Sequence, residues 1–132
     1  MKTLNIALVD DEKDFHEIFN IFLRPYISDD KVAVFNFLSA IDFLEYLETD
    51  SHQVRIIILL SDINMPDMDG ISLCEIINEK YPHIETYIAT AYGNDEYKSK
   101  AKEVGVKDFF TKPVNFKVIQ ELIEKKIEEY NI

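Results

Sequence analysis

Acidic side chains stand at the ends of two apolar, strand-like runs of this sequence. Asp10 and Asp11 follow the run 4–9, and Asp62 closes the stretch that begins with the run 54–60. Carboxylates brought together repel one another, so at least one is pushed toward protonation unless positive charge lies beside them. Mg²⁺ suits such a place, because it takes oxygen ligands and keeps several waters. The residues predict a Mg²⁺ site, completed by a backbone carbonyl from the loop 62–65.

A hydroxyl and an amine end two further apolar runs. Thr90 follows the run 84–89, and Lys112 follows the run 106–110. Phosphoryl transfer depends on positioning and on neutralising phosphoryl oxygens more than on proton chemistry, and a carboxylate can be the attacking group. Asp62 is the best-placed nucleophile, because its strand is the most apolar. Asp10 and Asp11 are better interpreted as metal ligands, with Thr90 and Lys112 each holding a phosphoryl oxygen.

Strands and helical patterns must alternate to bring these residues together. We expect strands at the five runs 4–9, 32–37, 54–60, 84–89 and 106–110, each followed by a helix. Such a chain folds as an α/β protein, with a doubly wound parallel sheet covered on both faces. Ligands then bind at the carboxyl ends of the strands. We expect Pro25 to end the first helix and Ser39 with Asp42 to form a capping box. Gly105 and Asn115 are predicted helix caps.

Composition narrows the class of protein. The 132 residues fit one domain, and a formal net charge of −11 argues against direct nucleic-acid binding, which needs a basic face. Apolar runs are too short for a membrane span, and the start shows no signal-peptide pattern, so we expect a cytoplasmic protein without membrane contact. The one cysteine, Cys74, is expected in the core. We interpret His16, His52 and His83 as surface residues, because they show no ligand spacing.

Four sequence blocks, in this order, resemble the receiver domains of bacterial two-component response regulators. The blocks are Val9-Asp10-Asp11-Glu12, Ser61-Asp62-Ile63-Asn64-Met65-Pro66-Asp67-Met68-Asp69-Gly70, Thr90-Ala91-Tyr92 and Phe110-Thr111-Lys112-Pro113. The resemblance covers essentially the whole chain, so we expect residues 1–132 to be a single receiver domain with a flavodoxin-like fold of strand order 2-1-3-4-5. It implies that Asp62 is the phosphoacceptor. Asp11, Asp62 and the carbonyl of Asn64 would contact Mg²⁺, with Asp10 helping through water.

The resemblance also implies a switch. Thr90 and Lys112 would hold the phosphoryl group, and Phe109 would turn inward when Thr90 moves toward it, although Phe110 competes for the inward position. Lys112-Pro113 would be a cis peptide. A histidine kinase or phosphotransfer protein would supply the phosphoryl group. The face formed by the fourth helix, fifth strand and fifth helix would then change its protein partner.

Departures and competing interpretations accompany this resemblance. Asp11 and Asp62 are farther apart than usual, so we expect longer loops around 24–31 or 49–54. No output domain follows the last helix, so the chain is either a stand-alone receiver or part of a longer protein. A constitutive binding module of the same fold has no reason to retain the acidic site. A phosphatase with an Asp nucleophile would place it after the first strand, with a second Asp two positions on, a spacing that Asp10-Asp11-Glu12 does not cleanly offer. A flavin-binding relative would need a phosphate-cradling loop rich in Gly, Ser and Thr, whereas the loop Asp10-Asp11-Glu12-Lys13 would repel a phosphate.

Overall fold

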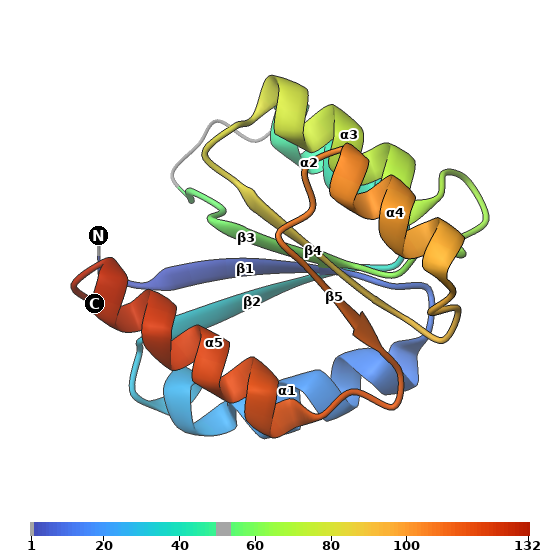
Figure 1. The fold of residues 1–132 in the computed structure, drawn as a ribbon. Coiled ribbons are helices and arrows are strands. Elements are labelled where there is room, and N and C mark those ends of the chain that lie inside the picture. Colours follow the sequence, from blue (N-terminus) through green and yellow to red (C-terminus); the bar gives the residue numbers. More distant parts are fainter. Residues whose placement is uncertain (1, 50–53) are drawn as a thin grey trace.

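The computed structural model describes residues 2–49 and 54–132, which form one central sheet between two layers of helices (Figure 1). The elements are β1 (Leu4–Val9), α1 (Lys13–Ser28), β2 (Val32–Phe37), α2 (Ala40–Thr49), β3 (Ile58–Ser61), α3 (Gly70–Lys80), β4 (Glu85–Thr90), α4 (Asp95–Glu103), β5 (Asp108–Thr111) and α5 (Phe116–Glu129). All strand pairs are parallel and the order is β2-β1-β3-β4-β5. The predicted fold class and strand order are confirmed.

Two hydrophobic clusters lie on opposite faces of this sheet. Helices α1 and α5 cover one face and α2, α3 and α4 cover the other (Figure 1). Along β3, Ile58 and Leu60 pack toward the first layer, whereas Leu59 packs toward the second. A strand buried on both faces needs apolar residues at every position. This explains why the central run is apolar without alternation.

Several element boundaries differ from the sequence expectations. Helix α1 does not end at Pro25 but continues to Ser28, with the amide of Asp29 donating to the Pro25 carbonyl at 3.2 Å. A proline in the last turn removes one amide donor, yet its own carbonyl still accepts. The stretch 24–31 is therefore mostly helix, so the longer loop is not found at this one of the two places where we expected it. The other place, 49–54, lies mostly outside the described part of the chain. Strand β3 begins only at Ile58, and residues 50–53, including His52, lie outside the described part of the chain.

The predicted caps at Gly105 and Asn115 are confirmed, and so is the Ser39 half of the predicted capping box. The Ser39 hydroxyl accepts from the Asp42 amide at 3.1 Å, and the Asn115 side chain accepts from the Lys117 amide at 3.1 Å. Gly105 follows α4 with a φ of 98°, a conformation that favours glycine. Cys74 is fully buried, and burial raises the pKa of its thiol to about 12. It is a core residue, as expected. Within the described residues, no helix is long and apolar enough to cross a membrane.

Candidate functional site

The register of the central strands sets two carboxylates side by side. Val9 pairs with Ser61 across β1 and β3, so the next residues, Asp10 and Asp62, leave the sheet together. The amide of Asp62 donates to the carbonyl of Val9 at 3.0 Å, which fixes this arrangement. Both carboxyl residues are nearly inaccessible, with 1% of Asp10 and 7% of Asp62 exposed. The sheet therefore brings two acids together at the buried end of its central strands.

Asp11 joins them to form an acidic cluster. Asp10, Asp11 and Asp62 each offer a carboxylate oxygen, and these oxygens lie within 4.8 Å of one another. Oxygen ligands at this spacing fit a hard divalent cation such as Mg²⁺. Asp11 is exposed, so the cluster opens to solvent on one side. Asn64 lies in the exposed loop after β3, and the part of its carbonyl in metal binding stays a prediction.

Lys112 is the counter-charge of this cluster. Its ammonium donates to Asp10 Oδ2 at 2.7 Å, to Glu12 Oε1 at 3.1 Å and to Asp62 Oδ2 at 3.4 Å. Burial works to lower the pKa of Lys112, but the hydrogen bond to Asp10 and the charges of Asp10 and Asp62 outweigh it and raise the pKa. The lysine therefore stays charged at the site. The Lys112-Pro113 peptide is cis, as predicted.

The charge of Asp10 is only partly compensated. Burial raises the pKa of Asp10, although hydrogen bonds from Lys112 and from the Glu12 amide work to lower it. The Glu12 amide donates to Asp10 Oδ1 at 2.9 Å. One ammonium is thus shared among several carboxylates, and the most buried of them remains short of positive charge. A bound cation would supply that charge.

The Asp62 carboxylate is aimed by its own backbone. The amide of Ile63 donates to Asp62 Oδ1 at 2.7 Å, while Oδ2 faces Lys112. The Ser61 hydroxyl donates to the carbonyl of Asp62 at 2.8 Å. Gly70, the first residue of α3, passes so close that an added Cβ would meet that same carbonyl. Only glycine allows this approach, so Gly70 belongs to the structure of the site.

Thr90 and Phe109 lie on the neighbouring strands. Thr90 is fully buried at the end of β4, its hydroxyl accepts from the Tyr92 amide at 3.3 Å, and its carbonyl accepts from the Lys112 amide at 2.8 Å. The hydroxyl keeps a hydrogen that it can donate. Phe109 packs toward the α4 side of the sheet and Phe110 toward the α5 side, because neighbouring strand residues face opposite ways. The role of Phe109 as a switch stays a prediction.

Sequence reasoning missed three contributors to the site. His16 is buried rather than a surface residue: its Nε2 lies 2.7 Å from the carbonyl of Asp10, and its Nδ1 lies 2.8 Å from Asn36 Oδ1. Glu12 binds Lys112, and the ring of Phe15 lies under the same ammonium. The helical spacing of apolar residues in α1 marks Phe15 as a residue that packs against the core, and nothing in that spacing points to Lys112. A signal for Glu12 was present, since it directly follows Asp10 and Asp11.

Comparison with known proteins identifies relatives of this arrangement. The family model described as response regulator receiver domain matches residues 6–124. The DNA-binding transcriptional regulator NtrC of Proteus hauseri is 34% identical over 130 residues, covering 98% of this chain and 26% of NtrC. The response regulator protein PilR of Pseudomonas aeruginosa is 31% identical over 93% of this chain and 26% of PilR. The chain thus spans about a quarter of the length of these two relatives.

Solved structures agree in fold. The BeF3-activated receiver domain of DrrB, a Thermotoga maritima protein, superposes with a TM-score of 0.80 at 26% identity, covering 96% of this chain and 98% of that one. A CheY-like receiver domain protein from Methanospirillum hungatei has a TM-score of 0.79 at 24% identity, covering 96% of this chain and 95% of that one. At this identity, the similarity to the Methanospirillum hungatei protein shows a shared fold alone.

The close approach of Gly70 to Asp62 leads to a stability prediction. Replacing Gly70 with Ala forces the added Cβ against the backbone carbonyl of Asp62, so the loop or the start of α3 must shift. We expect the free energy of unfolding in urea to fall by about 1–3 kcal/mol. Glu75→Ala, at an exposed position of the same helix, is the control and should change stability by about 0.5 kcal/mol or less. Equal stability of the two variants would contradict the packing argument.

Proposed function

The chain belongs to the response regulator receiver domains of two-component systems, and from that premise we propose that Asp62 accepts a phosphoryl group in a Mg²⁺-dependent reaction. The observation that carries the proposal is the position of Lys112, whose ammonium contacts Asp62 and Asp10 at once. A nucleophilic carboxylate beside a fixed positive charge and further oxygen ligands is what transfer of a highly charged group requires.

The transfer step uses residues of this chain. A carboxylate oxygen of Asp62 attacks the phosphorus of the donor, a phosphohistidine or a small acyl phosphate. A P–O bond to Asp62 forms as the bond to the donor nitrogen or oxygen breaks, and the leaving group departs with the electron pair of that bond. Lys112 and the Thr90 hydroxyl would each donate a hydrogen bond to a phosphoryl oxygen. Charge-assisted hydrogen bonds of this kind are the strong ones.

A divalent cation fits the acidic cluster of Asp10, Asp11 and Asp62. When bound, Mg²⁺ would offset the charge of the phosphoryl oxygens and of the carboxylates. Asp11 and Asp62 would be direct ligands together with the carbonyl of Asn64, and Asp10 would act through water. The spacing of the three carboxylates supports this assignment, because no side chain has to be brought from elsewhere. The same residues would let the domain catalyse its own dephosphorylation.

Phosphorylation would act as a switch. A phosphoryl group adds about −1.5 to −2 charges at the end of β3, and the Thr90 hydroxyl would move toward it. Phe109 beside α4 would follow into the space that Thr90 leaves, changing the face formed by α4, β5 and α5. A downstream protein that reads this face would respond. Three further parts of the proposal are supported by family membership alone. The donor would be a histidine kinase or phosphotransfer protein, and the setting would be the cytoplasm. Residues 1–132 would form one receiver domain.

The proposal is tested by phosphoryl uptake. We expect the intact mass to rise by one phosphoryl group after incubation with acetyl phosphate and Mg²⁺, and not when Mg²⁺ is chelated. Asp62→Asn keeps the size of the side chain but removes the nucleophile, so uptake should be lost. Asp67→Asn, in the exposed loop after β3, is the matched control and should retain it. Full uptake by Asp62→Asn would show that another residue is the acceptor.

The role of the Thr90 hydroxyl is tested by an isosteric substitution. Thr90→Val preserves the shape of a fully buried side chain but removes the hydrogen-bond donor. A hydrogen bond to a charged group contributes about 1.5–3 kcal/mol, so we expect uptake from acetyl phosphate to slow by about tenfold or more. Thr86→Val, also fully buried on β4 but bonded to Asn78, is the control and should take up phosphate at the wild-type rate. Equal slowing in both variants would assign the effect to the strand instead of the hydroxyl.

A further inference from the structure

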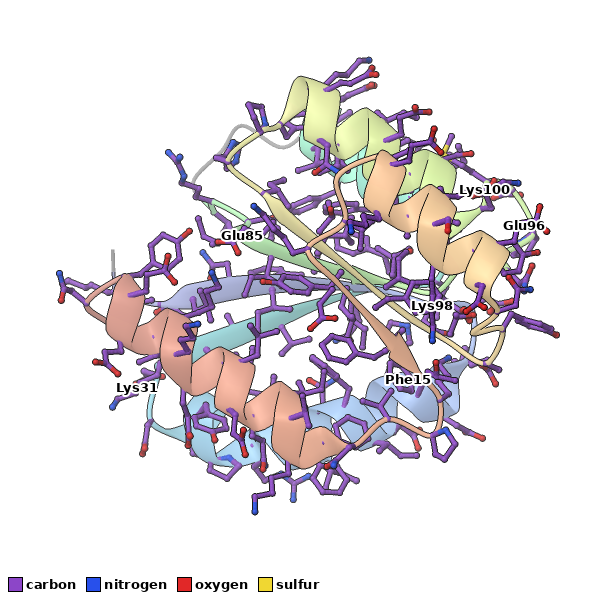
Figure 2. The ribbon with its side chains drawn as sticks, viewed as in Figure 1. Phe15, Lys31, Glu85, Glu96, Lys98 and Lys100 are labelled. Carbon is purple, nitrogen blue, oxygen red and sulfur yellow. The ribbon has the colours of Figure 1, made fainter. Side chains whose placement is uncertain are left out.

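Besides its carboxylate partners, the ammonium of Lys112 contacts an aromatic ring. Its nitrogen lies 4.2 Å from the centroid of the Phe15 ring. Phe15 stands in the first turn of α1, at the edge where the strands end, opposite the end that carries Glu85 (Figure 2). We propose that Phe15 is a positioning residue for phosphoryl transfer, whose ring holds the Lys112 ammonium beside Asp62 by a cation–π contact. The inference rests on the proposed function and adds a residue to it.

The ring differs in kind from the other partners of Lys112. A cation within about 6 Å of a ring centroid is attracted by the negative face of the ring, and more strongly where water is excluded. The Lys112 side chain is only 13% exposed, so the contact is largely shielded. Asp10 and Asp62 are also the proposed ligands of a metal and the acceptor of the phosphoryl group. A ring carries no such second task, so its attraction persists while the carboxylates change partners.

The ring of Phe15 is itself fixed in place. Its centroid lies 6.3 Å from that of Phe19 and 6.2 Å from that of Phe116, and Phe116 stacks on Phe22 at 4.4 Å. These four phenylalanines join the first two-thirds of α1 to the start of α5. Rings packed in this way have little freedom to turn. The aromatic cluster therefore presents one ring face to Lys112 from a rigid support.

Fluorination of the ring distinguishes a cation–π role of Phe15 from an ordinary packing role. A trifluorinated phenylalanine keeps nearly the size and apolar character of the ring but removes the electron density that attracts a cation. Incorporated at position 15, it should leave the fold intact and weaken only the hold on Lys112. The same residue at position 19 is the matched control, because Phe19 contacts Phe15 in the same cluster and belongs to the buried core.

Two readouts are expected to respond at position 15 and not at position 19. Phosphoryl uptake from acetyl phosphate with Mg²⁺ should slow by about three- to tenfold, with a monofluorinated ring in between. In the metal-free protein, acylation of Lys112 by an amine-reactive reagent, followed by peptide mass analysis, should become faster by a similar factor. Phe15→Tyr should match the wild type and Phe15→Leu should resemble the trifluorinated protein, which keeps the test open if a fluorinated chain folds poorly.

Two results would overturn the inference, and they are distinct. If the wild type takes up phosphate, but both readouts for the trifluorinated ring at position 15 equal those of the wild type, the ring is packing only and the phosphoacceptor proposal stands. If the wild type takes up no phosphate under any condition, the proposed function fails and the transfer role of Phe15 fails with it. A graded slowing with fluorine content, confined to position 15, is the result that we expect.

Discussion

Repulsion among carboxylates at one edge of the sheet is the constraint on which the site depends. Strand register brings Asp10 and Asp62 together, and Asp11 adds a third charge on the side of the cluster that opens to solvent. Lys112 offsets part of this charge from the far end of the chain. Its contact with Asp10 spans 102 positions of sequence, so the ion pair also joins the first strand to the last loop. The remaining imbalance is the physical basis of the proposal that the cluster binds a cation and, with it, a phosphoryl group.

The rest of the structure serves to hold these charges in place. Two apolar layers bury the central strands, so their ends are fixed, and backbone amides aim the carboxylates of Asp62 and Asp10. Gly70 lets α3 start directly against the backbone of Asp62. On the other side, His16 binds the carbonyl of Asp10 through its imidazole. Carboxylates held in place by a rigid backbone need little rearrangement during the proposed phosphoryl transfer.

The sequence predicted those features that depend on short stretches of the chain, namely the strands and the polar residues that end them. Apolar runs located the five strands, since a doubly covered sheet demands them, and the polar residues closing those runs marked the site. The carboxylate cluster followed because parallel strands end at one edge. Predictions failed where tertiary contacts decide. Pro25 lies inside α1 because the last turn tolerates a missing donor. His16 is buried because Asn36, from strand β2, completes its hydrogen bonds. Helical periodicity marks Phe15 as apolar, but only the folded chain places its ring under Lys112.

The most direct test of cation binding by the carboxylate cluster is thermal stability as a function of Mg²⁺ concentration, for the wild type and for Asp11→Asn. A cation that binds only the folded state raises stability in proportion to the logarithm of its concentration once sites fill. We expect the wild type to gain stability with Mg²⁺. Asp11→Asn should be the more stable protein without metal, because one repelling charge is gone, and should respond little to Mg²⁺. An unresponsive wild type, or an equal response in both proteins, would contradict the account of a carboxylate cluster that requires a cation.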